Sequence, residues 1–273
     1  SMVTYLYFRT PDVKEIVFGG SANFQASGGF GPNQVATAIG LGIFILVVLI
    51  VVRQKITGFL LLDLLFLLYF IYRGLLTFSR GGVLTGGIAL VVFLFFYTLS
   101  EKKTLRSFFK YVLIGGAILS ASWLYTSDAT GGMLDNRYAG KNARGVKKAD
   151  VTSGRTAIIK EQLKSFTEEP LGIGVGNGKY KRQLEGGHVT AASHNEIGRI
   201  IEEHGIIGVV FLTMLLLIPL INFLKSNNYQ RAFIGAFYLF WFLTINHSAM
   251  RIAFPGFIYA LSLIHIIDDG SEE

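Results

Sequence analysis

The chain has 273 residues, of which 51% are hydrophobic and 16% are charged, and its formal net charge is +7. With a mean hydropathy of +0.49, it has the composition of a membrane protein with several spans rather than that of a soluble globular domain. The sequence contains no cysteine, which excludes disulfides and thiolate metal sites, and it has no separate basic soluble domain for nucleic acid. We therefore expect the lipid bilayer, and no nucleic acid, as a partner.

The first 34 residues contain charged side chains and no sustained apolar core followed by a cleavage site. This pattern is not that of a signal peptide. We expect residues 1–34 to form an extracytoplasmic segment, and the chain to be the C-terminal part of a longer protein.

Apolar windows predict the membrane spans that follow, since a helix needs about 20 apolar residues to cross a bilayer core. Four windows fall within residues 35–125 and three within residues 195–267. They are Val35–Val52, Ile56–Tyr72, Val83–Leu99, Phe109–Tyr125, Ile206–Leu224, Ala232–Ala249 and Phe254–Ile267. The last window is the weakest, because it is short and contains Pro255 and His265. The windows predict an all-α polytopic membrane protein with about seven transmembrane helices.

The basic residues of the short loops predict the orientation, because cytoplasmic loops are enriched in lysine and arginine. One face has eight basic residues and the other has three. The eight are Arg53, Lys55, Lys102, Lys103, Arg106, Lys110, Lys225 and Arg231. That face is predicted to be cytoplasmic, together with the tail at residues 268–273. Residues 126–194 then form one long extracytoplasmic loop, and loops of this length are usually functional.

The long loop has order of its own. Ile159, Leu163 and Phe166 are spaced as on one face of a helix, so residues 154–168 are predicted to form an amphipathic helix. The helix could lie on the outer membrane surface or cap the bundle of spans, and the sequence leaves both open. The glycines of Pro170–Asn177 follow no strand, which argues against a dinucleotide site and favours a tight loop against substrate.

Two short motifs contain an arginine beside glycine. In Ser79-Arg80-Gly81-Gly82, at the start of the third span, the glycines would let a ligand approach free N–H groups that favour an anion. Arg80 could hold a phosphate through two parallel hydrogen bonds. Ser153-Gly154-Arg155 repeats the arrangement in the first turn of the loop helix. The alternatives are an interfacial arginine beside a flexible turn at Arg80 and a solvated arginine at Arg155.

His194 and Asn195 end the long loop, with Gly205 and Gly208 following in the next span. Histidine has an unperturbed pKa near 6.5 and can accept a proton at neutral pH. Ionisable groups at membrane depth are costly and are kept mainly where they act on a substrate, ion or proton. A structural histidine is the alternative. The other histidines complete no metal-ligand spacing with His194, so no metal and no cofactor is expected.

Taken together, these motifs resemble the O-antigen ligase/polymerase family of bacterial envelope glycosyltransferases. The resemblance covers most of the chain from about Gly28 onward. Its elements, in order, are Gly28-Gly29-Phe30-Gly31-Pro32-Asn33, Ser79-Arg80-Gly81-Gly82, Ser153-Gly154-Arg155, Pro170-Leu171-Gly172-Ile173-Gly174 and His194-Asn195 with Gly205 and Gly208. Family members usually have about twelve spans, so about five would lie upstream of Ser1. The family often has an arginine where Gln25 stands here.

The resemblance implies a GT-C-like fold in the bacterial cytoplasmic (inner) membrane, with the active site on the extracytoplasmic face. It implies transfer of a glycan from a polyprenyl (undecaprenyl) diphosphate carrier to an acceptor hydroxyl, without a metal. Arg80 and Arg155 would bind the diphosphate and His194 would be the general base. The supporting residues would be Ser79, Gly81, Gly82, Asn195, Gly205 and Gly208.

The acceptor is expected to be lipid A-core, as in an O-antigen ligase. A polymerase of the same family, which uses a second lipid-linked glycan as acceptor, is the first alternative. A transporter or flippase for the lipid-linked glycan is the more distant one.

Overall fold

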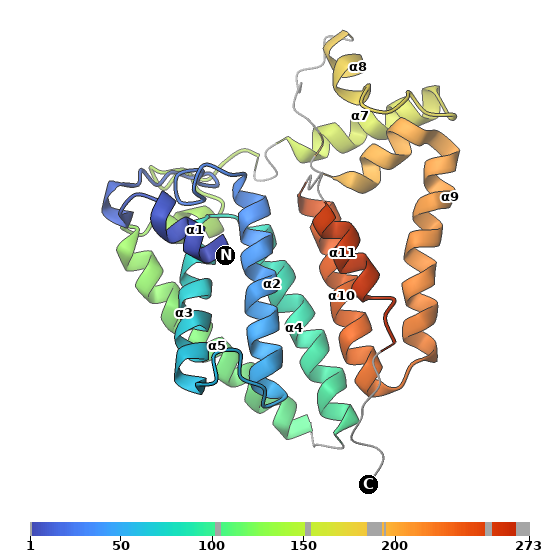
Figure 1. Ribbon diagram of the computed structural model, residues 1–273. Helices are drawn as coiled ribbons and strands as arrows, with labels where there is room; N and C mark the ends of the chain where they lie inside the picture. The colour runs from blue at the N-terminus through green and yellow to red at the C-terminus, as the bar shows by residue number, and fades with distance from the viewer. Residues whose placement is uncertain are drawn as a thin grey trace.

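Figure 1 shows a computed structural model of the protein, which describes residues 2–101, 105–150, 154–184, 193, 195–248 and 253–265. The described residues form helices and no strand, with one isolated bridge between Lys141 and Lys147. In chain order the helices are α1 (Met2–Arg9), the 3-10 helix η1 (Val13–Glu15), α2 (Pro32–Val51), α3 (Leu60–Leu76), α4 (Arg80–Ser100), α5 (Leu105–Ala129), α6 (Met133–Tyr138), α7 (Arg155–Glu168), α8 (Gly178–Leu184), α9 (Glu196–Lys225), α10 (Asn228–His247) and α11 (Ala253–Leu261). The predicted all-α class is confirmed.

Within the described residues, four helices are long and apolar enough to cross a membrane, namely α2, α4, α5 and α9. Each contains one of the predicted apolar windows, apart from a residue at the end of the first. Many large apolar side chains on these helices are exposed, as expected where lipid replaces water. Seven spans and a GT-C-like arrangement remain predictions, because α3 has 17 residues and α11 only nine.

Helix α4 lies between α2 and α10 and packs against both (Figure 1). Glycines bring α2 and α4 together, because a Cβ at Gly40 would lie 2.6 Å from the carbonyl oxygen of Gly82 and one at Gly86 would lie 2.8 Å from that of Gly40. Small residues at such crossings are typical of membrane helices. Farther along, Phe44 of α2, Phe93 of α4 and Phe240 of α10 are buried and form the centre of the largest apolar cluster.

Helix α3 begins at Leu60, four residues later than the apolar window that starts at Ile56. The reason is the buried carboxylate of Asp63, which accepts hydrogen bonds from the backbone N–H groups of Ile56 and Thr57, both at 3.1 Å, and from the Thr57 hydroxyl at 2.8 Å. These bonds fold residues 56–59 into a turn over the start of the helix. Hydropathy cannot distinguish such a turn from a further turn of helix.

The last predicted span differs most from the structure. The window Phe254–Ile267 was predicted as one helix, but α11 ends at Leu261 and residues 262–265 are not helical. The Ser262 hydroxyl donates to the carbonyl oxygen of Tyr259 at 2.6 Å, and the backbone N–H of Leu263 bonds to Ala260. These bonds form a tight turn where the helix was expected to continue.

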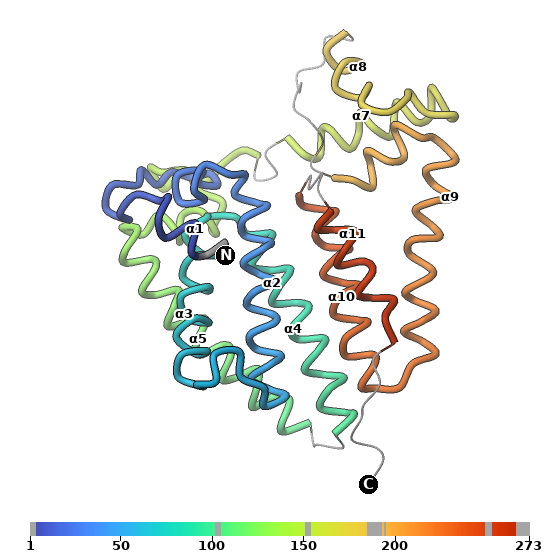
Figure 2. The backbone as a smooth tube through the Cα atoms, viewed as in Figure 1, coloured from blue at the N-terminus to red at the C-terminus, as the bar shows by residue number. Residues whose placement is uncertain are grey.

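The region predicted as a long loop, residues 126–194, contains the end of α5 and the helices α6, α7 and α8. Helix α7 confirms the predicted loop helix, with Gly154 as its N-cap. Its predicted apolar face is wrong by one residue, because Ile158, Gln162 and Ser165 are buried whereas Leu163 is 52% exposed. Helix α7 lies on the first part of α9 (Figures 1 and 2), and its position on the membrane surface or as a cap of the spans stays a prediction.

Candidate functional site

The turn between α3 and α4 directs Arg80. Ser79 is the N-cap residue of α4, and its buried hydroxyl donates to Asn33 Oδ1 at the start of α2, 2.7 Å away. Phe78, just before it, is fully buried and has a φ of 55°, which is uncommon for a residue with a side chain. The left-handed residue and the hydrogen bond together fix where α4, and with it Arg80, begins.

The two glycines after Arg80 lie against protein groups. A Cβ at Gly82 would overlap the backbone of Ala36 in α2, and one at Gly81 would lie 2.7 Å from Cγ of His247. Helix packing therefore explains why neither residue has a side chain. The predicted role of these glycines in admitting an anion remains a prediction.

The two predicted arginines, Arg80 and Arg155, are the first residues of α4 and α7 and lie within electrostatic range of each other. Burial lowers the pKa of the Arg155 guanidinium, and the positive charge of Arg80 lowers it further. The pKa of Arg137 in α6 is likewise lowered, first by burial and then by the charges of Arg80 and Arg155. Three guanidinium groups from α4, α6 and α7 thus lie within electrostatic range of one another, and we refer to them as the arginine cluster.

Arg137 was missed by the sequence reasoning. Its Nε donates to the carbonyl oxygen of Phe78 at 3.0 Å, and its Nη1 donates to that of Gly20 at 3.2 Å. It therefore ties α6 to the turn that directs Arg80. In the sequence Arg137 is one of many basic residues in the long loop, and nothing in its local pattern distinguishes it. Only the fold places it beside Arg80.

A second missed residue, His247, ends α10 and lies against the start of α4. Its Nε2 is 3.1 Å from the Thr37 hydroxyl of α2, and its Nδ1 is 2.7 Å from the carbonyl oxygen of Leu243. The Asn33 amide reaches the His247 carbonyl oxygen at 3.5 Å. The guanidinium of Arg155 lies within electrostatic range of the imidazole. His247 therefore belongs to the surroundings of the arginine cluster.

Asn195 is the N-cap residue of α9. Its Oδ1 accepts from the backbone N–H of Gly198 at 2.9 Å, a standard capping bond, and its Nδ2 donates to Asn246 Oδ1 at 3.3 Å. These bonds tie the start of α9 to the end of α10. His194, the predicted general base, lies outside the described residues, so its role remains a prediction.

A family model described as O-antigen ligase matches residues 64–213, which is more than half of the chain. The chain belongs to the O-antigen ligase family. It is a membrane protein with a function of the O-antigen ligase/polymerase type, and hence a glycosyltransferase-like enzyme that acts on lipid-linked glycans. No curated protein and no solved structure gives a significant match. The matched segment contains every site residue predicted from the sequence, whereas Asn33 and His247 lie outside it.

In this O-antigen ligase family protein, Gly205 marks a sharp kink in α9, with φ 60° and ψ −139° (Figure 2). The loop after Pro170 fits into the kink. Its Ile173 and Gly174 N–H groups donate to the carbonyl oxygens of Glu202 and Glu203 at 3.1 Å, and the Ile206 N–H donates to that of Pro170 at 2.9 Å. The loop was expected to lie against substrate, but this part of it lies against α9.

Gly208 follows one turn after the kink. A Cβ there would overlap the carbonyl oxygen of Ile200 and lie 3.0 Å from Cβ of His204, both in the segment before the kink. The glycine thus lets α9 fold back closely on itself. Gly205 and Gly208 therefore shape α9, and their support of the site is indirect.

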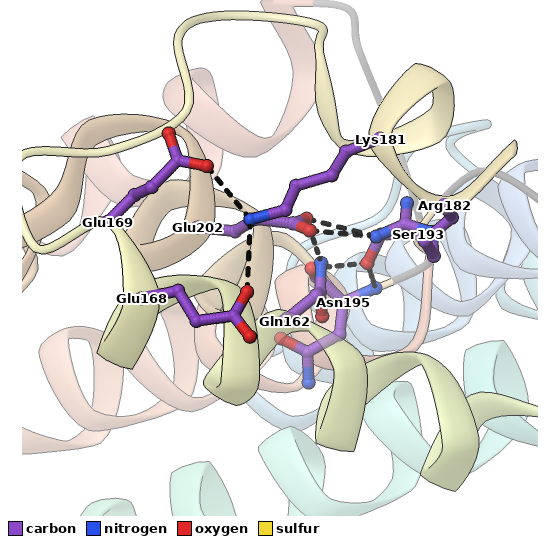
Figure 3. A network of polar contacts seen from close by, with 8 residues as sticks. All are labelled: Gln162, Glu168, Glu169, Lys181, Arg182, Ser193, Asn195 and Glu202. Atoms are coloured by element: carbon purple, nitrogen blue, oxygen red, sulfur yellow. Dashed lines mark hydrogen bonds and ion pairs between the residues drawn. The ribbon is translucent and has the colours of Figure 1, made fainter. Parts of the chain in front are cut away.

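A network of polar contacts holds α7 and α8 on the first part of α9 (Figure 3). Arg182 in α8 donates to both carboxylate oxygens of Glu202 in α9, at 2.9 and 3.1 Å, and Gln162 in α7 donates to Glu202 Oε2 at 3.2 Å. We call α7, α8 and residues 196–204 the cap. Because Arg155 is the first residue of α7, the cap determines where that guanidinium lies.

Among the described residues, no group of three or more His, Asp or Glu side chains is arranged to hold a metal ion. Two further cationic groups of the described residues, Arg137 and Arg155, lie within electrostatic range of Arg80. This arrangement suits an anionic ligand such as a phosphate, which several arginines can hold through parallel charge-assisted hydrogen bonds.

Proposed function

We propose that the protein transfers a glycan from a polyprenyl-diphosphate carrier to an acceptor hydroxyl at the outer face of the bacterial cytoplasmic membrane. The observation that supports the proposal is the arginine cluster, in which Arg80, Arg137 and Arg155 of α4, α6 and α7 lie within electrostatic range of one another beside a bundle of apolar helices. A diphosphate whose lipid tail lies along the helices would present its negative charges at this end.

The arginine cluster would bind the diphosphate of the donor and remain bound to it as the donor bond breaks. The acceptor oxygen attacks the anomeric carbon, the bond from that carbon to the diphosphate oxygen breaks, and its electron pair leaves with the diphosphate. Charge therefore grows on the leaving group, where preorganised cations lower the barrier. The proton of the acceptor hydroxyl goes to His194 as general base, and attack from the face opposite the diphosphate inverts the anomeric configuration. Transfer of this kind needs no metal ion.

For the acceptor we propose lipid A-core, the acceptor of an O-antigen ligase, because Gly28–Asn33 resemble ligase-type members of the family. A polymerase of the same family shares the donor and uses a second lipid-linked glycan as acceptor. A flippase would need cationic groups along a path through the membrane, whereas Arg80 and Arg155 are the first residues of their helices, α4 and α7, and Arg137 lies within electrostatic range of both.

The test is a His194→Ala replacement in the protein at its natural length, followed by gel analysis of the envelope polysaccharide and of the carrier-linked glycan. Loss of the polysaccharide product with accumulation of long glycans on the carrier is the expected result for a ligase, and accumulation of single repeats would identify a polymerase. His204→Ala is the matched control, because His204 is exposed on α9. If His194→Ala and His204→Ala give the same amounts of envelope polysaccharide and of carrier-linked glycan, the catalytic proposal is wrong.

A further inference from the structure

The last two residues of α10 contact opposite sides of the candidate site. His247 contacts the helix starts that direct Arg80, and Asn246 contacts the start of α9, next in the chain to His194. Both side chains are partly buried at the end of the bundle that also contains the arginine cluster.

The contacts of His247 lead to Arg80 through two routes. The imidazole lies directly over Gly81, where even a Cβ would lie 2.7 Å from ring atom Cγ. In addition, Nε2 meets the Thr37 hydroxyl at 3.1 Å, and the backbone carbonyl of His247 receives the Asn33 amide, whose Oδ1 accepts from Ser79. The ring thus braces the first turn of α4 against α2.

The hydrogen bonds of the ring specify its orientation. Nδ1 is 2.7 Å from the carbonyl oxygen of Leu243, so Nδ1 must donate. Nε2 then faces the Thr37 hydroxyl, which also lies 2.7 Å from the carbonyl oxygen of Asn33 and can donate to either. A ring that bonds at both ends cannot turn without losing a partner. An alanine here would leave Thr37, which is fully buried, without this contact.

The contacts of Asn246 connect the end of α10 with the start of α9. Its own amide donates to the carbonyl oxygen of Phe242 at 2.7 Å, which leaves Oδ1 to accept from Asn195 at 3.3 Å. Asn195 in turn caps α9 through the Gly198 N–H. The asparagine therefore fixes the residue that follows His194, and it does so without contacting the start of α4.

Because His247 contacts the starts of α2 and α4 whereas Asn246 contacts the start of α9, we propose that Asn246 and His247 are positioning residues with separate tasks. His247 holds Arg80 in place for the diphosphate of the donor, and Asn246 holds the start of α9 in place for the base. The inference rests on the proposed glycan transfer, and it adds a prediction that transfer alone does not make. Removing one side chain should affect donor binding, and removing the other should affect the chemical step.

The experiment uses the protein at its natural length, purified and reconstituted in phospholipid vesicles, with a synthetic polyprenyl-diphosphate-linked glycan as donor. His247→Ala should raise the KM for the donor about tenfold with little change in kcat, the pattern for lost binding in ground and transition states alike. Asn246→Ala should lower kcat about tenfold with little change in the donor KM. His247→Gln, which can still accept from Thr37, should recover most of the lost donor affinity.

Two further variants guard against effects on folding. Thr37→Val removes the partner of Nε2 at almost constant shape, so it should raise the donor KM even if His247→Ala does not fold. His265→Ala is the matched control, because His265 pairs with Gln230 near the opposite end of α10, at 2.9 Å, and should leave both constants unchanged. Thermal unfolding identifies variants that have lost their fold.

The outcomes separate this inference from the proposed function. One outcome is that the wild-type protein transfers the glycan while His247→Ala and Asn246→Ala change kcat and KM in the same way. In that case the two residues do not have separate tasks, and the proposal of glycan transfer is unaffected. If His247→Ala and Thr37→Val bind the donor as the wild type does, the role of His247 is wrong. If the wild-type protein neither binds nor uses the donor, the proposed function fails and this inference fails with it.

Discussion

The guanidinium of Arg182 and the carboxylate of Glu202 form an ion pair with almost no access to solvent, with Nη1 of Arg182 2.9 Å from Oε1 of Glu202 and side chains that are 4% and 1% exposed. The pair joins α8 to α9, and Gln162 adds α7 through its bond to the same carboxylate. A buried pair of this kind is a poor source of net stability, but it makes both partners depend on each other. The cap is therefore expected to open as a unit when either charge is lost.

Glu202→Gln or Arg182→Met should loosen the cap, since each leaves a buried charge without its partner. We expect a loss of about 3–5 kcal/mol in the local stability of the cap. Hydrogen exchange of the α7 and α8 amides measures this, and should become at least about a hundredfold faster, since about 1.4 kcal/mol corresponds to a factor of ten. Exchange in α2 and α4 should change little.

The neighbouring Lys181 provides the control. It pairs with Glu168 and Glu169, whose side chains are 45% and 52% exposed, so Lys181→Met should cost less than about 1 kcal/mol. The double variant Arg182→Met with Glu202→Met removes both charges and should recover much of the loss. Equal effects of Lys181→Met and Arg182→Met would contradict the role given to the buried pair.

Gly205→Ala should destabilise the protein strongly. A φ of 60° with a ψ of −139° is a backbone conformation essentially restricted to glycine and costs another residue about 1–3 kcal/mol, before the overlap of its Cβ with the Pro170 carbonyl is counted. Gly87→Ala in α4 is the control, because no atom lies within 4 Å of the added Cβ and the helix should tolerate it. Thermal unfolding in detergent compares the two. If the Gly205→Ala variant unfolds at the same temperature as the Gly87→Ala variant, the glycine at the kink is not required for stability.

Tyr138 allows a test by pH. Burial raises the pKa of its phenol to about 12, well above the ordinary value of 10, and its hydroxyl has no hydrogen-bond partner among the described residues. Because the folded pKa exceeds the unfolded one, the contribution of Tyr138 to stability is complete below pH 10 and is lost as the pH rises from 10 to 12.

Tyr138→Phe should remove that loss, so the stability of the variant should fall less steeply than that of the wild type between pH 10 and 12. At neutral pH we expect the variant to be as stable as the wild type or about 1 kcal/mol more stable, since a buried hydroxyl without a partner is removed. Unfolding followed at several pH values measures both effects. A variant that loses stability at neutral pH would mean that the hydroxyl does have a partner in the folded protein.

The apolar helices were predictable from the sequence, because the requirement to span lipid acts locally on each stretch of about 20 residues. The long apolar part of α9 illustrates this, since its window was predicted to begin at Ile206 and the kink lies at Gly205. The polar part before the kink was also expected to be helical, because the helix that leads into this span was predicted to open at His194 and residues 195–267 were assigned to the last three spans. The sequence did not indicate the kink itself or the contacts of residues 196–204 with α7 and α8.

The sequence indicated those residues of the candidate site that lie within recognisable motifs. It did not indicate the residues that only the folding of the chain brings near the site. Arg80 and Arg155 stood beside glycines at predicted helix starts, which made them visible. His247 contacts Thr37, a residue 210 positions away in the chain, and no local pattern reports such a contact. Arg137 was hidden among other basic residues of the same loop.

The arginine cluster leads to the last prediction, which concerns the donor. Arg80→Ala and Arg155→Ala should each reduce glycan transfer at least about thirtyfold, because loss of a charge-assisted contact in a buried site costs about 2–5 kcal/mol. Arg137→Met should raise the donor KM about tenfold, and Arg137→Lys should not rescue it, since lysine cannot bond to two carbonyl oxygens and keep a planar fork.

Arg144→Met is the matched control for Arg137, because Arg144 is an exposed arginine of the same loop and belongs to no part of the cluster. It should transfer glycan as the wild type does. Donor titrations at two salt concentrations sharpen the comparison, since the loss of a partly buried cation should persist in high salt whereas a surface charge effect should disappear. If Arg137→Met and Arg144→Met behave alike at both salt concentrations, Arg137 does not belong to the donor site and the cluster reduces to Arg80 and Arg155.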